Sequence, residues 1–326
     1  SGKSLTGYDT DEDGAITLRA KNTGVGVRTL TLNINGGTVS CTSLSISNIT
    51  SKSRVILNVS NGGTLTIENN LTLSAFGADT DVQLLANTGT GNTLNLGGTI
   101  IGISTSDGVI DMGSSAGVST FNFNGSSAQT IPFDDPTDLI YSDIQISNAV
   151  ALESALSSAN VTGNLTISAG GVFDDGGFTN SFTGDITNAG TYNGTGTMNL
   201  TGNLTISVGG VVNDGGGGNV FNGDITNAGT YEAISGSFDV SGDFTNSGIF
   251  NSSGCNINLE GNWDNTGGTY SPATGDNFTF DGTAASTITG ATDWYELTAD
   301  NPAGVTVSSG AQSIHGILDL DQGTFT

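Results

Sequence analysis

An internal repeat constrains the fold of this chain more than any other feature. Residues 162–192 return 39 positions later as residues 201–231, and 24 of the 31 aligned residues are identical. Each repeat divides in two, because a glycine that precedes Asn or Asp recurs at about half this interval. These glycines are Gly163, Gly184, Gly202, Gly223, Gly242 and Gly261, and Gly282 continues the series. A period of about 20 residues is typical of a solenoid, in which each repeat packs on its neighbours.

Two files of apolar residues keep a constant phase with these glycines. The first file lies two residues before the glycine and contains Phe182, Leu200, Phe221, Val240, Leu259 and Phe280. The second file contains Phe173, Tyr192, Val212, Tyr231, Phe250 and Tyr270. A constant phase predicts that each file stacks from coil to coil. We therefore interpret Phe173, Tyr192, Tyr231, Phe250 and Tyr270 as an internal aromatic stack rather than as a platform for sugars.

Short alternating segments between the turns indicate strands. In residues 238–240 and 278–280, apolar residues flank one polar residue, which is the pattern of a half-buried strand. The predicted fold class is all-β: a parallel β-helix, or β-solenoid, with about 20 residues per coil and about 16 coils in 326 residues. Prior expectation favours a right-handed coil. Residues 149–159 leave two interpretations open, a short helix or extended structure within another coil.

A larger repeat predicts the organisation of the domain. Residues 121–131 reappear as residues 278–288, with six of eleven positions identical. We therefore expect one elongated β-solenoid over residues 1–326, with irregular amino-terminal coils at 1–120, a regular repeat unit at 121–277 and the start of a second copy at 278–326. The second copy is incomplete, so the sequence predicts further repeats of the same kind in the parent chain.

The charge distribution limits the partners. The net charge is −25, and the last of the six Lys and Arg is Arg54, so the charged residues of the segment 55–326 are all acidic. This balance argues against nucleic acid and anionic lipid as partners. The chain has no run of about 18 apolar residues, so no membrane span is predicted. Apolar residues still make up 35% of the chain, which favours a packed core over disorder.

One motif has the spacing of a cation-binding loop. Asp9, Asp11 and Asp13 alternate before Gly14, and in such a loop the carbonyl of Ala15 is the next ligand for Ca²⁺. The bidentate Glu expected at position twelve is missing, because Ala20 stands there. Two interpretations therefore remain open, a structural Ca²⁺ site and a solvated acidic turn. No cofactor is required, and Ca²⁺ at this loop is the one candidate.

The sequence argues against an enzyme. Asp134–Asp135 and Asp174–Asp175 resemble pairs of catalytic carboxylates, but the second pair recurs as Asn213–Asp214, which replaces one carboxylate by an amide. Related enzymes usually need an Arg, Lys or His to bind an acidic sugar or abstract a proton, and after Arg54 only His315 is of these types. We interpret His315 as a turn or surface residue.

The aromatic pair Trp294 and Tyr295 lies outside the regular files. Together with Asp293 it is the candidate contact for a glycan, because an exposed aromatic ring can stack on a sugar. Trp263, in contrast, occupies the same position after the turn as Ile225 and Phe244, and we expect it in the core.

Cys41 and Cys255 lie too many coils apart to form a disulfide, so each is expected to be a small buried residue.

Residues 278–326, together with the GDITNAGTY coils before them, resemble the repetitive regions of very large secreted surface proteins and adhesins of bacteria that use type IX secretion. The resemblance covers about residues 121–326 well and the rest of the chain loosely. It implies an extracellular β-solenoid stalk or adhesive filament on the bacterial cell surface. The function expected is thus non-catalytic and structural or adhesive, with further repeats, like subunits or surface glycans as partners. The alternatives are a carbohydrate-binding module and a self-assembling filament or sheath subunit.

Overall fold

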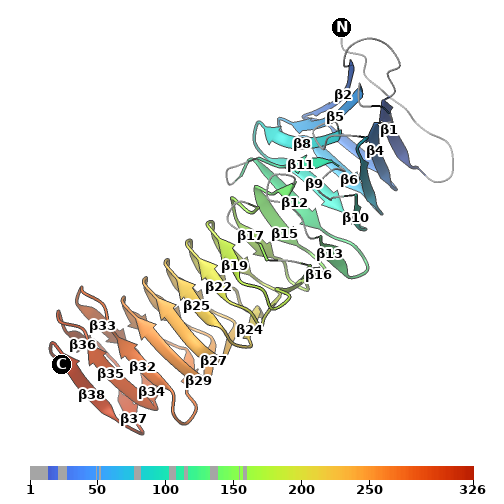
Figure 1. The fold of residues 1–326 in the computed structure, drawn as a ribbon. Coiled ribbons are helices and arrows are strands. Elements are labelled where there is room, and N and C mark those ends of the chain that lie inside the picture. Colours follow the sequence, from blue (N-terminus) through green and yellow to red (C-terminus); the bar gives the residue numbers. More distant parts are fainter. Residues whose placement is uncertain are drawn as a thin grey trace. The chain divides into compact units, whose positions relative to one another are not determined.

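The computed structural model describes residues 14–20, 28–48, 50, 53–76, 82–102, 108–113, 117–132, 139–153, 155–156 and 160–326. The chain divides into two compact units, residues 1–163 and residues 164–326. Figure 1 shows both units as successive rungs of parallel strands. The fold is an all-β parallel β-solenoid of about 13 turns, with about 21 residues per turn.

In the first unit, each strand pairs with the strand one turn further along the chain. The pairing follows the orders β1-β4-β7-β10, β2-β5-β8-β11-β14, β3-β6-β9-β12-β15 and β13-β16. These strands are β1 (Ile16–Ala20), β2 (Arg28–Asn35), β3 (Thr38–Cys41), β4 (Leu44–Asn48), β5 (Ser53–Ser60), β6 (Thr64–Ile67), β7 (Leu71–Ser74), β8 (Val82–Thr88), β9 (Asn92–Leu96), β10 (Ile100–Ile101), β11 (Val109–Asp111), β12 (Ser119–Phe123), β13 (Gln129–Ile131), β14 (Leu139–Ile140), β15 (Asp143–Ile146) and β16 (Ala149–Leu152).

In the second unit, the strands follow one another at shorter intervals. The pairing follows β17-β20-β23-β26-β28-β30-β33-β36, β18-β21-β24-β27-β29-β32-β35-β38 and β34-β37, with β19-β22-β25 joining β27 and β31 joining β29. These strands are β17 (Leu165–Ile167), β18 (Val172–Asp174), β19 (Asn180–Phe182), β20 (Ile186–Asn188), β21 (Thr191–Gly194), β22 (Met198–Leu200), β23 (Leu204–Ile206), β24 (Val211–Asp214), β25 (Gly218–Phe221), β26 (Ile225–Asn227), β27 (Thr230–Val240), β28 (Phe244–Asn246), β29 (Ile249–Leu259), β30 (Trp263–Asp264), β31 (Thr269–Ser271), β32 (Asn277–Phe280), β33 (Ser286–Thr289), β34 (Thr292–Trp294), β35 (Glu296–Asp300), β36 (Val305–Val307), β37 (Gln312–Ile314) and β38 (Leu318–Gln322).

The number of turns is lower than the 16 that a uniform period predicts, because turns of the first unit are longer. Leu65 of β6 pairs with Leu94 of β9, a separation well above the predicted period. In the second unit Phe173 pairs with Tyr192, a separation close to that period. The prediction of about 16 coils is therefore wrong, since the period near 20 belongs to the second unit and does not extend to the amino-terminal coils.

The core follows from the alternation along each strand. In β9 and β12 every second side chain is buried and the side chains between them are half-buried. The first file of the second unit is registered from strand to strand, with Leu259 of β29 opposite Val240 and Phe280. At residues 149–152 the chain is the strand β16, so the extended interpretation of that segment is confirmed there.

Candidate functional site

The glycine–Asx turns of the second unit form an exposed ladder of hydrogen bonds, which we call the Asx ladder. In each coil the side-chain Oδ1 of the Asx residue accepts the backbone N–H of the equivalent residue one coil later, at 2.8–2.9 Å. The members are Asn164, Asp185, Asn203, Asp224, Asp243 and Asn262, and the last accepts the N–H of Thr287. The ladder therefore ties successive coils together on the solvent side.

The glycines before these residues are required by close approach between coils. A Cβ at Gly223 would lie 2.5 Å from the carbonyl oxygen of Gly202, and one at Gly261 would lie 2.3 Å from that of Gly242. Real Cβ atoms do not approach an oxygen so closely, so the coils could not stack with another residue there. The sequence motif of Gly followed by Asn or Asp thus encodes a contact between coils and an acceptor for the next coil.

A second ladder of asparagines lies inside the same unit, and we call it the buried Asn ladder. Asn227 Nδ2 donates to Asn246 Oδ1 at 2.9 Å, and Asn246 Nδ2 donates to Asn265 Oδ1 at 2.7 Å. Each of these amides also donates to a backbone carbonyl, which for Asn246 is that of Thr269 at 3.0 Å. All three side chains are buried. This ladder was not predicted from the sequence, although Asn stands two positions before a glycine in each of these coils.

The aromatic stack of the second unit is internal, as its constant spacing predicts. Phe173 lies opposite Tyr192, and Phe250 lies opposite both Tyr231 and Tyr270. Val212 of β24 separates Tyr192 from Tyr231, and all five rings are buried. Ring centroids are 5.3 Å apart for Phe173 and Tyr192, 5.7 Å for Tyr231 and Phe250, and 5.2 Å for Phe250 and Tyr270. Trp263 is also buried and lies opposite Phe244. These rings therefore fill the core and present no face to a sugar.

Trp294 does not occupy the exposed position predicted for it. Its side chain is fully buried, with ring centroids 4.8 Å from Phe278 and 5.6 Å from Trp263. The indole Nε1 donates to Gln312 Oε1 at 2.9 Å. The prediction of an exposed ring is wrong. Strand β34 forms a further face of the coil, and the Trp294 side chain on it points into the aromatic core. Asp293 is exposed and Tyr295 is half-buried.

Tyrosine hydroxyls of the stack meet buried polar groups of the preceding coil. The Tyr231 hydroxyl donates to Asp214 Oδ2 at 3.1 Å, and the Tyr270 hydroxyl lies 3.2 Å from the Ser252 hydroxyl. For Tyr192, no hydrogen-bond partner of the hydroxyl occurs among the described residues. Burial is the largest cause that raises the pKa of Tyr231 well above its ordinary value, and the charge of Asp214 adds to it.

The two members of the Asp174–Asp175 pair lie on different sides of the chain. Asp174 is exposed, whereas Asp175 is 1% exposed. Asp175 accepts backbone N–H groups from Gly177, Thr195 and Gly196. The structure therefore does not bring these carboxylates together as a general acid and a general base. The pair Asp134–Asp135 lies outside the described residues.

The candidate Ca²⁺ loop is described only at its end. Asp9, Asp11 and Asp13 lie outside the described residues, and Ala15 is half-buried just before β1. Within the ranges that the structure describes, no group of three or more His, Cys, Asp or Glu side chains could hold a metal ion. The Ca²⁺ interpretation of the loop therefore stays a prediction.

His315 is exposed, and its backbone N–H donates to the Trp294 carbonyl at 3.0 Å.

The two cysteines are free thiols in buried positions. Burial, followed by the nearby charge of Glu68, raises the pKa of the Cys41 thiol to about 11. Burial also raises the pKa of Cys255. Both thiols are therefore protonated at neutral pH and have little nucleophilic character.

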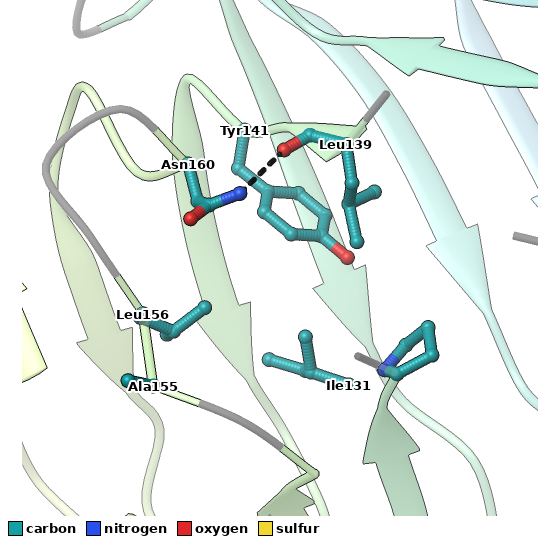
Figure 2. A pocket seen from close by; sticks show the side chains of 7 residues that line it. Ile131, Leu139, Tyr141, Ala155, Leu156 and Asn160 are labelled. Carbon is teal, nitrogen blue, oxygen red and sulfur yellow. Dashed lines mark hydrogen bonds between the residues drawn. The ribbon is translucent and has the colours of Figure 1, made fainter. Parts of the chain in front are cut away.

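A small cavity lies in the first unit, and Figure 2 shows the side chains around it. Its volume is about 10 Å³, which is room for about one water molecule. Asn160 Nδ2 donates to the Leu139 carbonyl at 3.1 Å beside it. The lining residues are Ile131, Pro132, Leu139, Tyr141, Ala155, Leu156 and Asn160. A mostly apolar space of this size cannot hold an organic substrate.

No family model matches the chain, and comparisons with curated proteins and with solved structures found no significant match. The resemblance to secreted surface proteins is therefore supported at the level of the β-solenoid fold alone. Of the residues that the structure describes, none belongs to a helix long and apolar enough to cross a membrane.

Proposed function

We propose that this chain is a non-catalytic structural or adhesive segment of an extracellular bacterial surface protein, a rigid stalk or filament of stacked β coils. The observation that carries the proposal is the Asx ladder of the second unit, in which six side chains each bind the backbone of the next coil. A ladder of this kind links neighbouring coils in addition to the backbone pairing, and it contains no group arranged around a ligand.

The buried Asn ladder supports the same function. The Asn246 amide bonds to the next coil through both its side-chain partner and a backbone carbonyl. A shift of one coil relative to the next would break both sets of bonds and leave buried polar groups unpaired. Such a stack resists bending and local opening, which are the properties that a stalk needs.

The charge suits a location outside the cell. The segment 55–326 contains no Lys or Arg and therefore offers no cleavage site to a trypsin-like protease. The partners that the proposal requires are further coils, either in the parent chain or in like subunits. The carbohydrate-binding alternative loses its main contact, because Trp294 is buried.

Electron microscopy of the purified chain, with Ca²⁺ and with EDTA, tests the proposal. Separate elongated particles in both conditions are expected for a stalk segment. Filaments that join end to end would favour the self-assembling alternative, and compact round particles would contradict both. Antibody labelling of intact cells that produce the parent protein tests the location, since labelling only after lysis would contradict an extracellular segment.

A further inference from the structure

The interior of the second unit holds three aspartates, Asp175, Asp214 and Asp276, which are 1%, 6% and 1% exposed. No Lys or Arg follows Arg54 in the sequence, so no Lys or Arg of this unit can neutralise them. Moving an ionised carboxylate out of water is costly unless hydrogen-bond donors or a cation compensate for the lost hydration. The donors around each carboxylate therefore decide how readily it stays ionised.

Asp175 and Asp276 are enclosed mainly by backbone N–H groups. Asp175 accepts three of them at 2.8–3.3 Å, and Asp276 accepts three at 2.6–3.1 Å together with a hydroxyl at 2.6 Å. Fixed N–H donors favour the ionised form of a carboxylate. The donors to Asp276 are the N–H groups of Gly254, Cys255 and Ala273 and the hydroxyl of Ser252.

Asp214 is compensated less well. Its backbone donor, the N–H of Gly216, lies at 3.3 Å, and its other donors are neutral side chains, the Tyr231 hydroxyl at 3.1 Å and the Asn219 amide. On the preceding coil the residue that pairs with Asp214 is Gly194, which has no side chain to donate a hydrogen bond. The carboxylate therefore depends on two neutral side chains and one long backbone hydrogen bond.

The titratable groups that face Asp214 are all acids. Asp175 lies two coils earlier in the same column, β21 contributes Tyr192, β27 contributes Tyr231 and β29 contributes Cys255. A negative charge on Asp214 is therefore opposed by the charge on Asp175, and no Lys or Arg of residues 55–326 stabilises it. Proton uptake would remove this repulsion and the cost of burying a second charge.

We propose that Asp214 is a proton-sensitive latch inside the second unit: proton uptake at this carboxylate stabilises the coils around β24 and β27, and proton release destabilises them. The segment would then be held more tightly in mildly acidic surroundings than at neutral or alkaline pH. This inference is independent of where the parent protein is located and of what it binds.

The pKa of Asp214 agrees with the geometry. Burial raises it from 3.8 to about 6, although the hydrogen bonds from Gly216, Tyr231 and Asn219 partly offset this effect. Since the unfolded chain titrates near its ordinary value, about 3.9, the folded state binds this proton more tightly. The stabilisation is therefore complete below about pH 4, decreases as the pH rises toward about 6 and is absent above that value.

Thermal unfolding of the full chain between about pH 4.5 and 8 tests the proposal. We expect the Tm of the wild type to rise on acidification by roughly 2–4 °C more than that of Asp214→Asn. Asp185→Asn is the matched control, because Asp185 is exposed and Asn203 occupies the next position of the same ladder. The control should follow the wild type at every pH.

A second variant keeps the test decisive if Asp214→Asn does not fold. Tyr231→Phe removes a donor to the ionised carboxylate, so carboxyl ¹³C NMR should show a titration near pH 6 in the wild type that moves to higher pH in Tyr231→Phe. The latch would be overturned if the Tm of Asp214→Asn depended on pH as that of the wild type does. It would also be overturned if NMR of the wild type showed no carboxyl group that titrates above pH 5. If CaCl₂ raised the Tm of the wild type at pH 7.5 and did not raise that of Asp214→Asn, the site would bind a cation. That result would also overturn the latch.

Discussion

The backbone N–H of Asp243 donates to Asp224 Oδ1 at 2.9 Å, so the exposed carboxylate of one coil holds the backbone of the next coil. The bond needs the oxygen and not the charge, because Asn203 and Asn262 do the same at other positions of the Asx ladder. A like charge one coil away is in fact unfavourable at the inter-strand spacing of about 4.8 Å.

Two substitutions of Asp224 separate these effects. Asp224→Asn keeps the acceptor and should leave the free energy of unfolding unchanged or raise it slightly at low salt. Asp224→Ala removes the acceptor and should lower the free energy of unfolding by about 0.5–1.5 kcal/mol, the usual contribution of such a hydrogen bond. Urea unfolding measures both. Equal losses for Asn and Ala would show that the ladder bond does not stabilise the stack.

The buried Asn ladder predicts a larger effect. Asn246→Ala deprives the Asn227 amide of an acceptor and the Asn265 amide of a donor, and both are buried. We expect a loss of about 2–4 kcal/mol, because an unpaired buried polar group costs about 1–3 kcal/mol. Thr266→Ala, at the exposed position after Asn265, is the control and should lose less than about 0.5 kcal/mol. A loss for Asn246→Ala no greater than that of the control would contradict the ladder.

The burial of Trp294 predicts a structural role for this residue. Trp294→Ala removes a ring that contacts Phe278 and Trp263 and should lower the free energy of unfolding by about 3–5 kcal/mol. Trp294→Phe should cost clearly less, since it keeps part of the ring. Chemical denaturation measures both variants, and fluorescence of the native protein gives an independent check, because both tryptophans should emit at the short wavelengths of buried indoles. A loss for Trp294→Ala no greater than that of an exposed substitution would show that the ring is not part of the core.

The sequence predicted the coil and its two apolar files because those features repeat. Phe173 and Tyr192 stand one period apart, and the same spacing places them on adjacent strands. The motif at Gly223 and Asp224 was predicted to mark the turn of each repeat. Its hydrogen bonds could not be predicted, because a hydrogen bond between coils depends on how the coils stack. The amino-terminal coils were predicted to be irregular, but their length could not be predicted for a related reason: residues added at a turn leave the stacked strands unchanged and erase the period.

The errors at the candidate sites have physical causes as well. Trp294 lies outside the regular files, and its burial depends on the third face formed by β34 and β37, which the sequence pattern does not reveal. Gly-rich flanks hide the fact that Asp214 follows Val212 by two positions in a strand, so that both side chains point to the same, buried side. The preserved aspartate in the two copies, Asp175 and Asp214, was the available signal, since the neighbouring Asp174 changes to Asn213.

Acidic side chains stack in a column at the ends of β29, β32 and β35, and no Lys or Arg follows Arg54 in the sequence. Glu260, Asp281 and Asp300 directly follow Leu259, Phe280 and Ala299, which are paired on three neighbouring strands, so these acids lie one above another. Burial, and then the charge of Glu260, raises the pKa of Asp281, so the folded state favours the protonated form and this group destabilises the protein as the pH rises.

Asp281→Asn should therefore raise the free energy of unfolding by about 0.2–1 kcal/mol at neutral pH and low salt. The gain should shrink at about 1 M NaCl, because salt screens interactions between exposed charges. For the same reason NaCl or a divalent cation should raise the Tm of the wild type, and EDTA should lower it if a bound divalent ion is responsible. Urea unfolding at low and high salt measures the variant. A gain that stays the same at both salt concentrations would mean that repulsion along this column does not limit stability, and the cost would then lie in burial of the Asp281 carboxylate itself.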